Sequence, residues 1–408
     1  MKIFWTSAWR IAFRELHRLL RDPNLVLILF IAPLAYTGLY GSIYLKKVEE
    51  AVPVDIVDLD ASPLSRDLIR EIDALQYVEV RQVGTSENEA EKAMLSNRTQ
   101  AWVMIPVGFS RDLRYGRGVT IPLVMSPGRL LVLSDVGIGI SQTAATFGAK
   151  VRAGILARQG IPVFQNPDFA TPIGFTYTSL FNPWLTYGDM ILPALMAVIF
   201  LQLVLIGSAG ATASEWASGS WPDLFAISET RTEPAVFGKL WMFISVFLAF
   251  AVLLRISVVP LFNIQIRGDG LLLLILLLLA FWAAAGMGLF VGSFLRFRTT
   301  AFVVLGFTSY PFFLLSGYAW PEAQMALPLR ILSRFLPTTP FLQGVNLLTQ
   351  MENGWEVLWP QLLNLGGLGV LFSALAVWRF RAIYDQQHFR TSDSGPCRNP
   401  LLGRAPER

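Results

Sequence analysis

The chain is poor in the side chains that build metal and redox sites. Among its 408 residues it has one cysteine, Cys397, and two histidines, His17 and His388. A single cysteine excludes an internal disulfide and any multi-cysteine metal site, and two histidines are too few for a zinc enzyme. Charged side chains make up 15% of the chain, whereas a soluble globular domain has about 25%. The hydrophobic share of 53% and the mean hydropathy of +0.50 therefore indicate a membrane protein.

Motifs that hold phosphates or activate a nucleophile are also missing. No G-x-x-x-x-G-K-[ST] occurs, and Gly238-Lys239 lacks the upstream glycine and the following Ser or Thr of a phosphate-binding loop. Neither H-E-x-x-H nor a nucleophile elbow is present. The net charge of +4 is small and concentrated near the ends of the chain, unlike a patch for nucleic acid. The sequence therefore predicts a subunit that is not an enzyme, holds no cofactor or metal directly, and binds no nucleic acid.

Six apolar runs are long enough to cross a bilayer, which requires roughly 20 residues of helix. The first follows a basic segment, but it is too long for a signal peptide and no A-x-A-like cleavage site follows, so we expect it to remain as an anchor. The predicted transmembrane helices lie at residues 24–45, 187–213, 240–262, 271–294, 300–317 and 357–380.

Basic residues near the span ends predict the orientation. They precede span one, separate spans four and five, and follow span six: Lys2, Arg10, Arg14, Arg18, Arg21, Arg296, Arg298, Arg379, Arg381 and Arg390. With six spans these sets fall on one side, so both termini, including a tail at 381–408, should be cytoplasmic. Residues 46–186 should then lie outside, and the exceptions to the rule are Arg267, Arg330 and Arg334.

Residues 46–186 have the pattern of a separate domain. Strands are predicted at 54–60, 77–83, 99–106 and 119–125, and helices at 62–72, 86–96, 110–116 and about 131–159. This alternation indicates an α/β sandwich around one sheet. The predicted fold class is an α-helical polytopic membrane protein with six transmembrane helices and one inserted extracytoplasmic α/β domain.

Residues 1–22 have the pattern of an amphipathic helix. Apolar residues and basic residues each recur at spacings of three and four, on two different faces: Trp5, Trp9, Phe13, Leu16 and Leu20, and Arg10, Arg14, His17, Arg18 and Arg21. Such a helix lies in the membrane interface. Pro23 should end it before span one, at 23–45, turns into the bilayer. The alternative is that the basic residues only anchor the cytoplasmic side.

Several motifs occur together along the chain. ELHRLLRDP ends the amphipathic helix, Pro33 lies in span one, VDIVDLDASPLSR opens the inserted domain, and an E-x-x-x-G-S/T pattern follows span two. This combination resembles the permease subunits of type 2 ABC exporters that have a large extracytoplasmic domain after span one. LLSGYAWPEAQMALPLRILSRFLPTTPFLQGVNLL similarly resembles the family's segment between spans five and six.

The resemblance implies partners and site residues. In that family the loop after span two carries a short coupling helix that docks on a separate ATP-binding subunit. Here it would be 214–239, and 318–346 would form short helices that re-enter the outer leaflet. The implied partners are the ATP-binding subunit with ATP and Mg²⁺, a second copy or a paralogous permease, and an envelope adaptor protein. The implied coupling residues are Glu215, Gly219, Ser220, Leu224, Arg231 and Lys239.

Candidates for a pathway or gate lie in or near the spans: Asp189, Arg255, Pro311, Gly317, Pro321 and Pro337. An intramembrane charge is costly and therefore a functional candidate, although Asp189 and Arg255 lie near the outer ends of their spans, where side chains can snorkel. The segment 187–380 holds spans two to six. The resemblance implies that the chain, in the plasma (inner) membrane of a bacterium, exports an amphipathic, drug-like or lipid-like molecule out of the cytoplasm or inner leaflet, powered by the separate ATP-binding subunit. A membrane-anchored sensor or envelope-assembly protein and a membrane-embedded enzyme are alternatives, which an adjacent gene for an ATPase or a kinase would separate.

Overall fold

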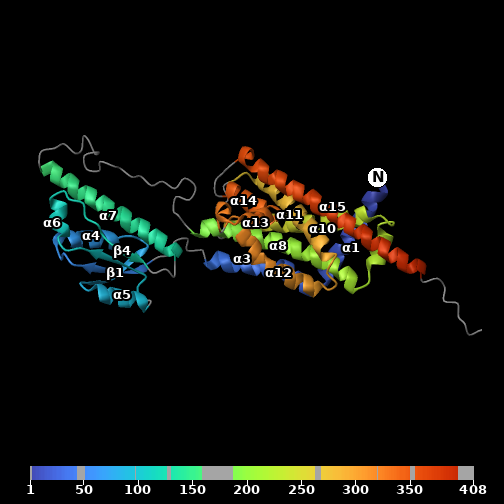
Figure 1. Cartoon of the computed structure of the whole chain (residues 1–408), viewed down its shortest axis with the longest axis horizontal. Coiled ribbons are helices and arrows are strands. Elements are labelled where there is room, and N and C mark those ends of the chain that lie inside the picture. The colour runs from blue at the N-terminus through green and yellow to red at the C-terminus, as the bar shows by residue number, and fades with distance from the viewer. Residues whose placement is uncertain are drawn as a thin grey trace, which may run out of the picture. The chain divides into compact units, whose positions relative to one another are not determined.

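The computed structural model describes residues 2–43, 51–96, 98–125, 130–158, 187–261, 268–318, 320–349 and 354–393. The chain divides into two compact units (Figure 1). The membrane unit comprises Met1–Leu45 and Gly188–Arg408, and the inserted domain comprises Lys46–Tyr187.

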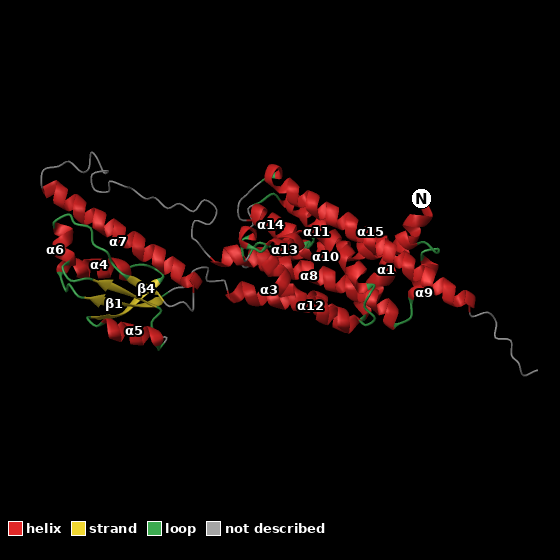
Figure 2. Cartoon of the chain, viewed as in Figure 1, coloured by secondary structure: helices red, strands yellow, loops and turns green. Residues whose placement is uncertain are grey.

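Six helical segments of the membrane unit are long and apolar enough to cross a membrane, as predicted. The first consists of α2 (Pro23–Val26), a π turn (Leu27–Ile31) and α3 (Ala32–Ile43). The others are α8 (Tyr187–Ala217), α10 (Thr232–Leu261), α11 (Gly270–Gly292), α12 (Arg298–Leu315) and α15 (Trp355–Asp393). The described part of the membrane unit consists of helices and the loops that join them (Figure 2). The predicted ends need correction, because α10 begins eight residues before 240 and α15 continues as helix into the predicted tail.

One helix ends and another begins at the entry into span one. α1 (Lys2–Arg21) ends immediately before Asp22, whose carboxylate accepts hydrogen bonds from the N–H groups of Asn24 at 3.0 Å and Leu25 at 3.3 Å. Pro23 occupies the first turn of α2, where its missing N–H costs nothing. The predicted break at Pro23 is confirmed.

Span one contains a widened turn at Leu27–Ile31. Pro33 follows it, has no N–H to donate to Leu29, and crowds the carbonyl of that residue in a regular α-helix. The N–H of Ala32 instead bonds to the carbonyl of Leu27, five residues back. The π turn accommodates the proline without breaking the span.

Glycine allows α11 to pack closely against α8. A Cβ at Gly292 would lie 2.3 Å from the carbonyl oxygen of Ala209, a distance that no side chain tolerates. Gly288 approaches Leu205 in the same way. These glycines therefore serve packing between spans.

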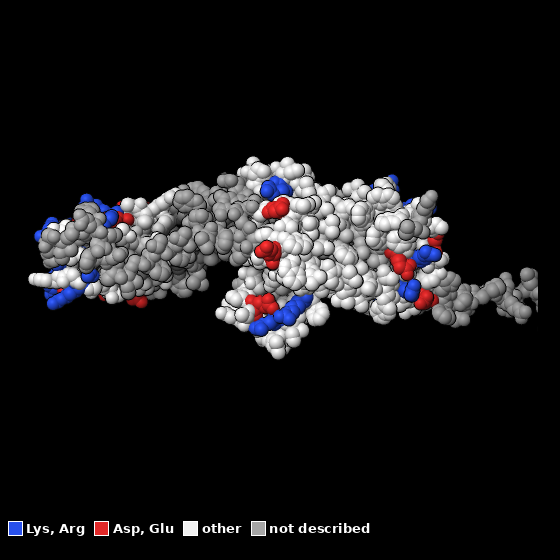
Figure 3. Space-filling model, turned by 90° about the horizontal axis from the view of Figure 1, so that it is seen from above, with Lys and Arg blue, Asp and Glu red and all other residues white. Residues whose placement is uncertain are grey.

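Three short helices connect α12 and α15. They are a 3₁₀ turn (Glu322–Gln324), α13 (Leu327–Arg334) and α14 (Thr338–Thr349). α14 is largely buried, whereas α13 exposes most of its apolar side chains. We call the end of the membrane unit that carries α13 and α14 the α14 end, and the opposite end, with α1 and α9 (Trp221–Ile227), the α9 end (Figure 2). Charged side chains of this unit gather toward its two ends, with an uncharged surface between them (Figure 3).

The inserted domain is built on a four-stranded sheet in the order β2-β1-β3-β4. β1 (Val52–Asp58) pairs parallel with β2 (Val78–Gly84) and β3 (Ala101–Ile105), and β4 (Leu123–Met125) pairs antiparallel with β3. β4 is shorter than the predicted 119–125, because Pro122 cannot donate a ladder hydrogen bond.

Helices cover both faces of this sheet (Figure 2). α4 (Pro63–Asp73), α6 (Phe109–Arg114) and α7 (Leu130–Arg158) share the larger core with the strands. On the other face, Ala90 of α5 (Glu87–Leu95) packs with strand residues Val57 and Trp102. The predicted strands and helices are all present, and they form the expected α/β sandwich.

Candidate functional site

Helix α1 has three faces. One is buried, and it packs against α10. The second is apolar and exposed, as at Trp9 (55%) and Phe13 (62%), and the third carries the basic residues. The sequence pattern predicted only the last two, because the small and apolar residues of the buried face merge with the apolar stripe. The buried face consists of Ser7, Ala8, Ile11, Ala12, Glu15 and Leu19.

A glycine sets the distance between α1 and α10. A Cβ at Gly238 would lie 2.5 Å from the carbonyl oxygen of Ala8 and 2.9 Å from the Cβ of Ile11. Aromatic rings pack at the same contact, with the centroids of Trp5 and Phe237 5.4 Å apart. The glycine of the predicted G-K pair is therefore a helix contact, which explains why that position has no side chain.

Glu215, near the end of α8, lies at the centre of a buried ion cluster. Arg14 of α1 donates two hydrogen bonds of 2.9 Å to its two carboxylate oxygens. Arg18 donates at 3.1 Å and Lys239 of α10 at 2.9 Å. The hydroxyl of Ser220, which precedes α9, donates to the second oxygen. The cluster therefore joins α1, α8, α9 and α10 at one point.

A second carboxylate offsets part of the positive charge of the cluster. Glu15 lies 2.9 Å from the Lys239 ammonium and 3.1 Å from Arg14. Glu215 and Lys239 are completely buried, and an isolated charge there would cost several kcal/mol. Pairing with a bidentate arginine and a lysine offsets that cost. Removing one partner leaves the other buried without compensation.

Four of the predicted coupling residues are buried in the structure. Glu215, Leu224 and Lys239 are 0% exposed and Ser220 is 5% exposed, so these side chains are not available to another protein here. The basic partners of Glu215 lie within this chain. Their part in coupling stays a prediction.

Gly219 forms the turn between α8 and α9. A Cβ there would meet no atom within 4 Å, but the residue has φ +64°, a conformation that favours glycine. It ends α8 and turns the chain toward α9. In the E-x-x-x-G-S/T motif, the glutamate and serine thus meet in the cluster and the glycine forms the turn.

Helix α9 buries one side and exposes the other. The ring of Trp221 meets Phe380 of α15 edge to face at 4.9 Å, and Phe225 meets Tyr384 at 5.2 Å. The outward side of α9 and the turn after it form an exposed surface, which we call the α9 face. It consists of Pro222, Asp223, Ala226, Glu229, Thr230 and Arg231. The predicted loop 214–239 is thus mostly helical, and only Arg231 of the predicted residues joins this surface.

A cleft of about 860 Å³ lies beside the ion cluster. It is lined by α1, α2, α8, α10 and α12, and its size matches pockets for small molecules. Arg18, Arg21 and Arg298 bring charge to it, whereas Leu29 and Phe243 are apolar. The lining is therefore suited to a molecule with one polar and one apolar end.

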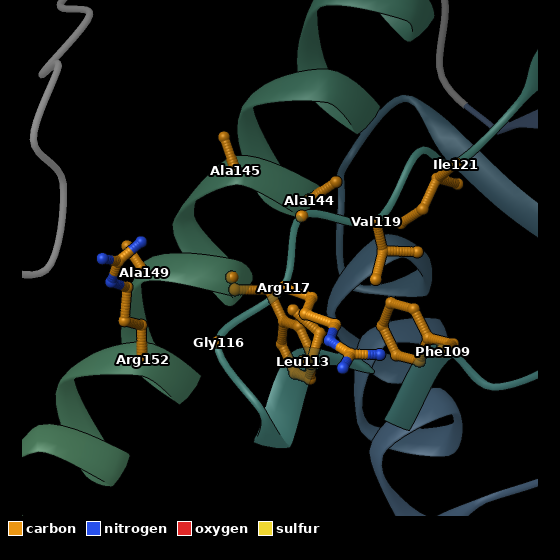
Figure 4. A pocket seen from close by; sticks show the side chains of 13 residues that line it. Phe109, Leu113, Gly116, Arg117, Val119, Ile121, Ala144, Ala145, Ala149 and Arg152 are labelled. Atoms are coloured by element: carbon orange, nitrogen blue, oxygen red, sulfur yellow. The ribbon is translucent and has the colours of Figure 1, made fainter. Parts of the chain in front are cut away.

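The inserted domain has its own cavity of about 520 Å³ (Figure 4). It lies between α6, the segment 116–121 and α7. Arg117 extends toward Phe109 and Leu113, while Arg152 lies on α7 at the other side (Figure 4).

The predicted pathway residues are dispersed. Pro311 lies within α12, Gly317 follows that helix with φ +84°, and Pro321 and Pro337 precede the 3₁₀ turn and α14. The side chain of Asp189, near the start of α8, lies outside the described residues. Arg255 of α10 lines a small apolar pocket at the α14 end. Among the residues that the structure describes, no ion pair or hydrogen bond joins these candidates, so they form no common site.

Comparison with known proteins gives a consistent result. The model of the family "ABC-2 family transporter protein" matches residues 24–378. The "Inner membrane transport permease YhhJ" of Escherichia coli (strain K12) is 24% identical over 384 residues, covering 92% of this chain and 97% of the relative. "Probable multidrug ABC transporter permease YbhS" of the same organism is 23% identical (91% and 96% covered). "Linearmycin resistance permease protein LnrN" of Bacillus subtilis (strain 168) is also 23% identical (88% and 94% covered). Because the family match spans most of the chain and all six spans, this multi-pass membrane protein belongs to the ABC-2 family of transporter permeases.

Proposed function

We propose that the chain is the membrane subunit of an ATP-driven exporter, with the α9 end in the cytoplasm. Family membership supports an ATP-binding partner, and it favours export over the sensor and enzyme alternatives. A second copy or a paralogous permease would complete the pathway. The names of two relatives, which refer to multidrug transport and linearmycin resistance, support an amphipathic, drug-like or lipid-like substrate. The inserted domain would lie outside and meet the substrate or an envelope adaptor protein.

The observation that supports the proposal is that α9 exposes one face while the ion cluster holds its first residue in place. Ser220 precedes α9 and donates to Glu215, which Arg14 and Lys239 hold from two other helices. A displacement imposed on the α9 face therefore reaches α1, α8 and α10 through short charged contacts. We expect nucleotide-driven closure of the partner to move these helices together.

The cleft beside the cluster would be where substrate enters the protein. It is lined by α1 and α10, the helices that the cluster joins, so its width depends on their separation. Asp22 and Arg298 form an ion pair at this cleft and connect the start of span one to the start of α12. Motion of α1 would thus alter the cleft and span five together.

The test compares substitutions on the α9 face with a substitution elsewhere on the surface. Ala226→Trp adds bulk and Asp223→Lys reverses a charge on exposed positions, so neither should disturb folding. Ala323→Trp, at an exposed alanine of the α14 end, is the matched control. The protein is co-expressed with an ATP-binding subunit encoded by an adjacent gene, and association and ATPase activity are measured in nanodiscs. Loss of association in both α9 variants, with the control unchanged, is expected. Unchanged association and ATPase activity in all three would refute docking through this face.

A further inference from the structure

Arg255 lies at the far edge of the membrane core as seen from the ion cluster. Lys239 and Arg255 are 16 residues apart on α10, which is about 24 Å at 1.5 Å per residue. The hydrocarbon core is about 30 Å thick. The guanidinium is therefore within reach of lipid phosphates at the α14 end by extension of the side chain.

This arginine has no partner among the described residues. No carboxylate, hydroxyl or carbonyl of the described chain forms an ion pair or hydrogen bond with it, and its helix neighbours Leu253 and Ile256 are exposed and apolar. A cation at this depth is costly without a counter-charge. Guanidinium binds phosphate with two parallel hydrogen bonds, so a lipid phosphate would meet the need.

An apolar pocket of about 100 Å³ lies directly beside the arginine. Residues of α8, α10, α11 and α14 line it, among them Met196, Phe200, Leu277 and Phe341. The volume is well below the roughly 300 Å³ at which pockets for drug-sized ligands begin. It suits a segment of an acyl chain. The pocket shares no lining residue with the cleft at the α9 end, so it is separate from the proposed substrate site.

We propose that Arg255 and this pocket hold one anionic phospholipid of the leaflet at the α14 end as a resident ligand. The phosphate pairs with the guanidinium, and part of one acyl chain fills the pocket between α8, α10, α11 and α14. The lipid is not the exported molecule. It neutralises the arginine and bridges four helices that contribute to the wall of the pocket.

The experiment uses the full chain in phosphatidylcholine nanodiscs that contain phosphatidylglycerol as a minor component. Native mass spectrometry after mild release counts the phosphatidylglycerol retained per chain. Arg255→Gln keeps most of the side-chain length. Arg330→Gln is the control, because Arg330 is a partly exposed arginine of the same end that donates a hydrogen bond to the carbonyl of Ala323. Ala251→Phe fills the pocket and leaves the charge in place.

We expect the wild-type protein and Arg330→Gln to retain one phosphatidylglycerol that Arg255→Gln and Ala251→Phe lose, with at least about tenfold lower occupancy. Phosphatidylglycerol should also raise the melting temperature of the wild type but not of Arg255→Gln. Equal losses at Arg255 and Arg330 would indicate general headgroup attraction and overturn the proposal. Unchanged retention of phosphatidylglycerol in Ala251→Phe would show that no acyl chain occupies the pocket, and would overturn that part of the proposal. Loss of export in Arg255→Gln with unchanged lipid retention would identify a pathway residue instead.

Discussion

Replacement of Glu215 by glutamine is the sharpest test of the ion cluster. The change preserves the size of the side chain but removes the negative charge that Arg14, Arg18 and Lys239 share. Glu15 is then the only carboxylate of the cluster facing three cations. Breaking a buried pair typically costs about 3–5 kcal/mol. The membrane unit, Met1–Leu45 and Gly188–Arg408, is slightly larger than the domains for which 1 kcal/mol shifts the melting temperature by about 2–4 °C, so at roughly 2 °C per kcal/mol the melting temperature should fall by roughly 6–10 °C.

The matched control lies in the same cluster. Arg18 also contacts Glu215, but its side chain is 40% exposed, and exposed pairs contribute about 0–1 kcal/mol. Arg18→Gln should therefore change the melting temperature by only a few degrees. Scanning fluorimetry of the 12 tryptophans reports both transitions in nanodiscs. Adding Lys239→Met to Glu215→Gln removes the surplus buried cation and should recover part of the loss.

Glu215→Gln also tests whether motion of α9 reaches the spans through the ion cluster. The α9 face is intact in Glu215→Gln, so the ATP-binding subunit should still associate, whereas stimulation of its ATPase by substrate should be lost. If Glu215→Gln melts no lower than Arg18→Gln, the buried pairing described above is wrong. If stability falls but substrate stimulation is retained, motion of α9 reaches the spans by another route.

Two further predictions concern the inserted domain and the orientation. Burial raises the pKa of Asp55 despite nearby arginines, so the folded domain binds this proton more tightly than the unfolded chain and its stability falls as pH rises above the ordinary value of 3.8. A fragment of residues 50–175 should be soluble with a mixed α/β circular dichroism spectrum. In this fragment Asp55→Asn should raise the melting temperature at pH 7 but not at acid pH. An equal effect of the substitution on the melting temperature at both pH values would contradict the raised pKa of Asp55. In a Cys397→Ser background, an impermeant thiol reagent applied outside should label a cysteine at the exposed Glu91 but not at the exposed Thr230, and the reverse pattern would invert the topology.

The spans and the domain elements were predictable because their signals are local. Apolar runs of about 20 residues and alternating strands each follow from neighbouring residues. The ion cluster was not predictable, because Arg14 and Glu215 are 201 residues apart and a glutamate beside a polar loop is ordinarily exposed. One signal was available. Arg14 and Arg18, spaced four apart, face the same side of α1 and together require an acidic partner if α1 packs on the spans.

The element ends were the least predictable part. The apolar run of span three begins at Leu240, but α10 begins at Thr232 because its first turns pack against α1 and the cluster instead of lipid. The E-x-x-x-G-S/T motif correctly predicted a short helix in the loop after span two, but the sequence did not show which side of α9 is buried. Which side of a seven-residue helix is buried depends on Phe380 and Tyr384, which lie more than 150 positions later in the chain.

The π turn at Leu27–Ile31 has a consequence for how span one can respond to α1. A π turn holds one residue more than an α turn, and each residue accounts for about 100° around a helix axis. Passing that extra residue along the span by one position would re-orient the side chains that it passes by about this angle and leave the helix on either side in place. Span one can therefore change which side chains of this turn face the neighbouring spans by rewinding locally, without tilting as a rigid rod. A pull on α1 would then be taken up at Leu27–Ile31 before it reaches the half of the span beyond Pro33.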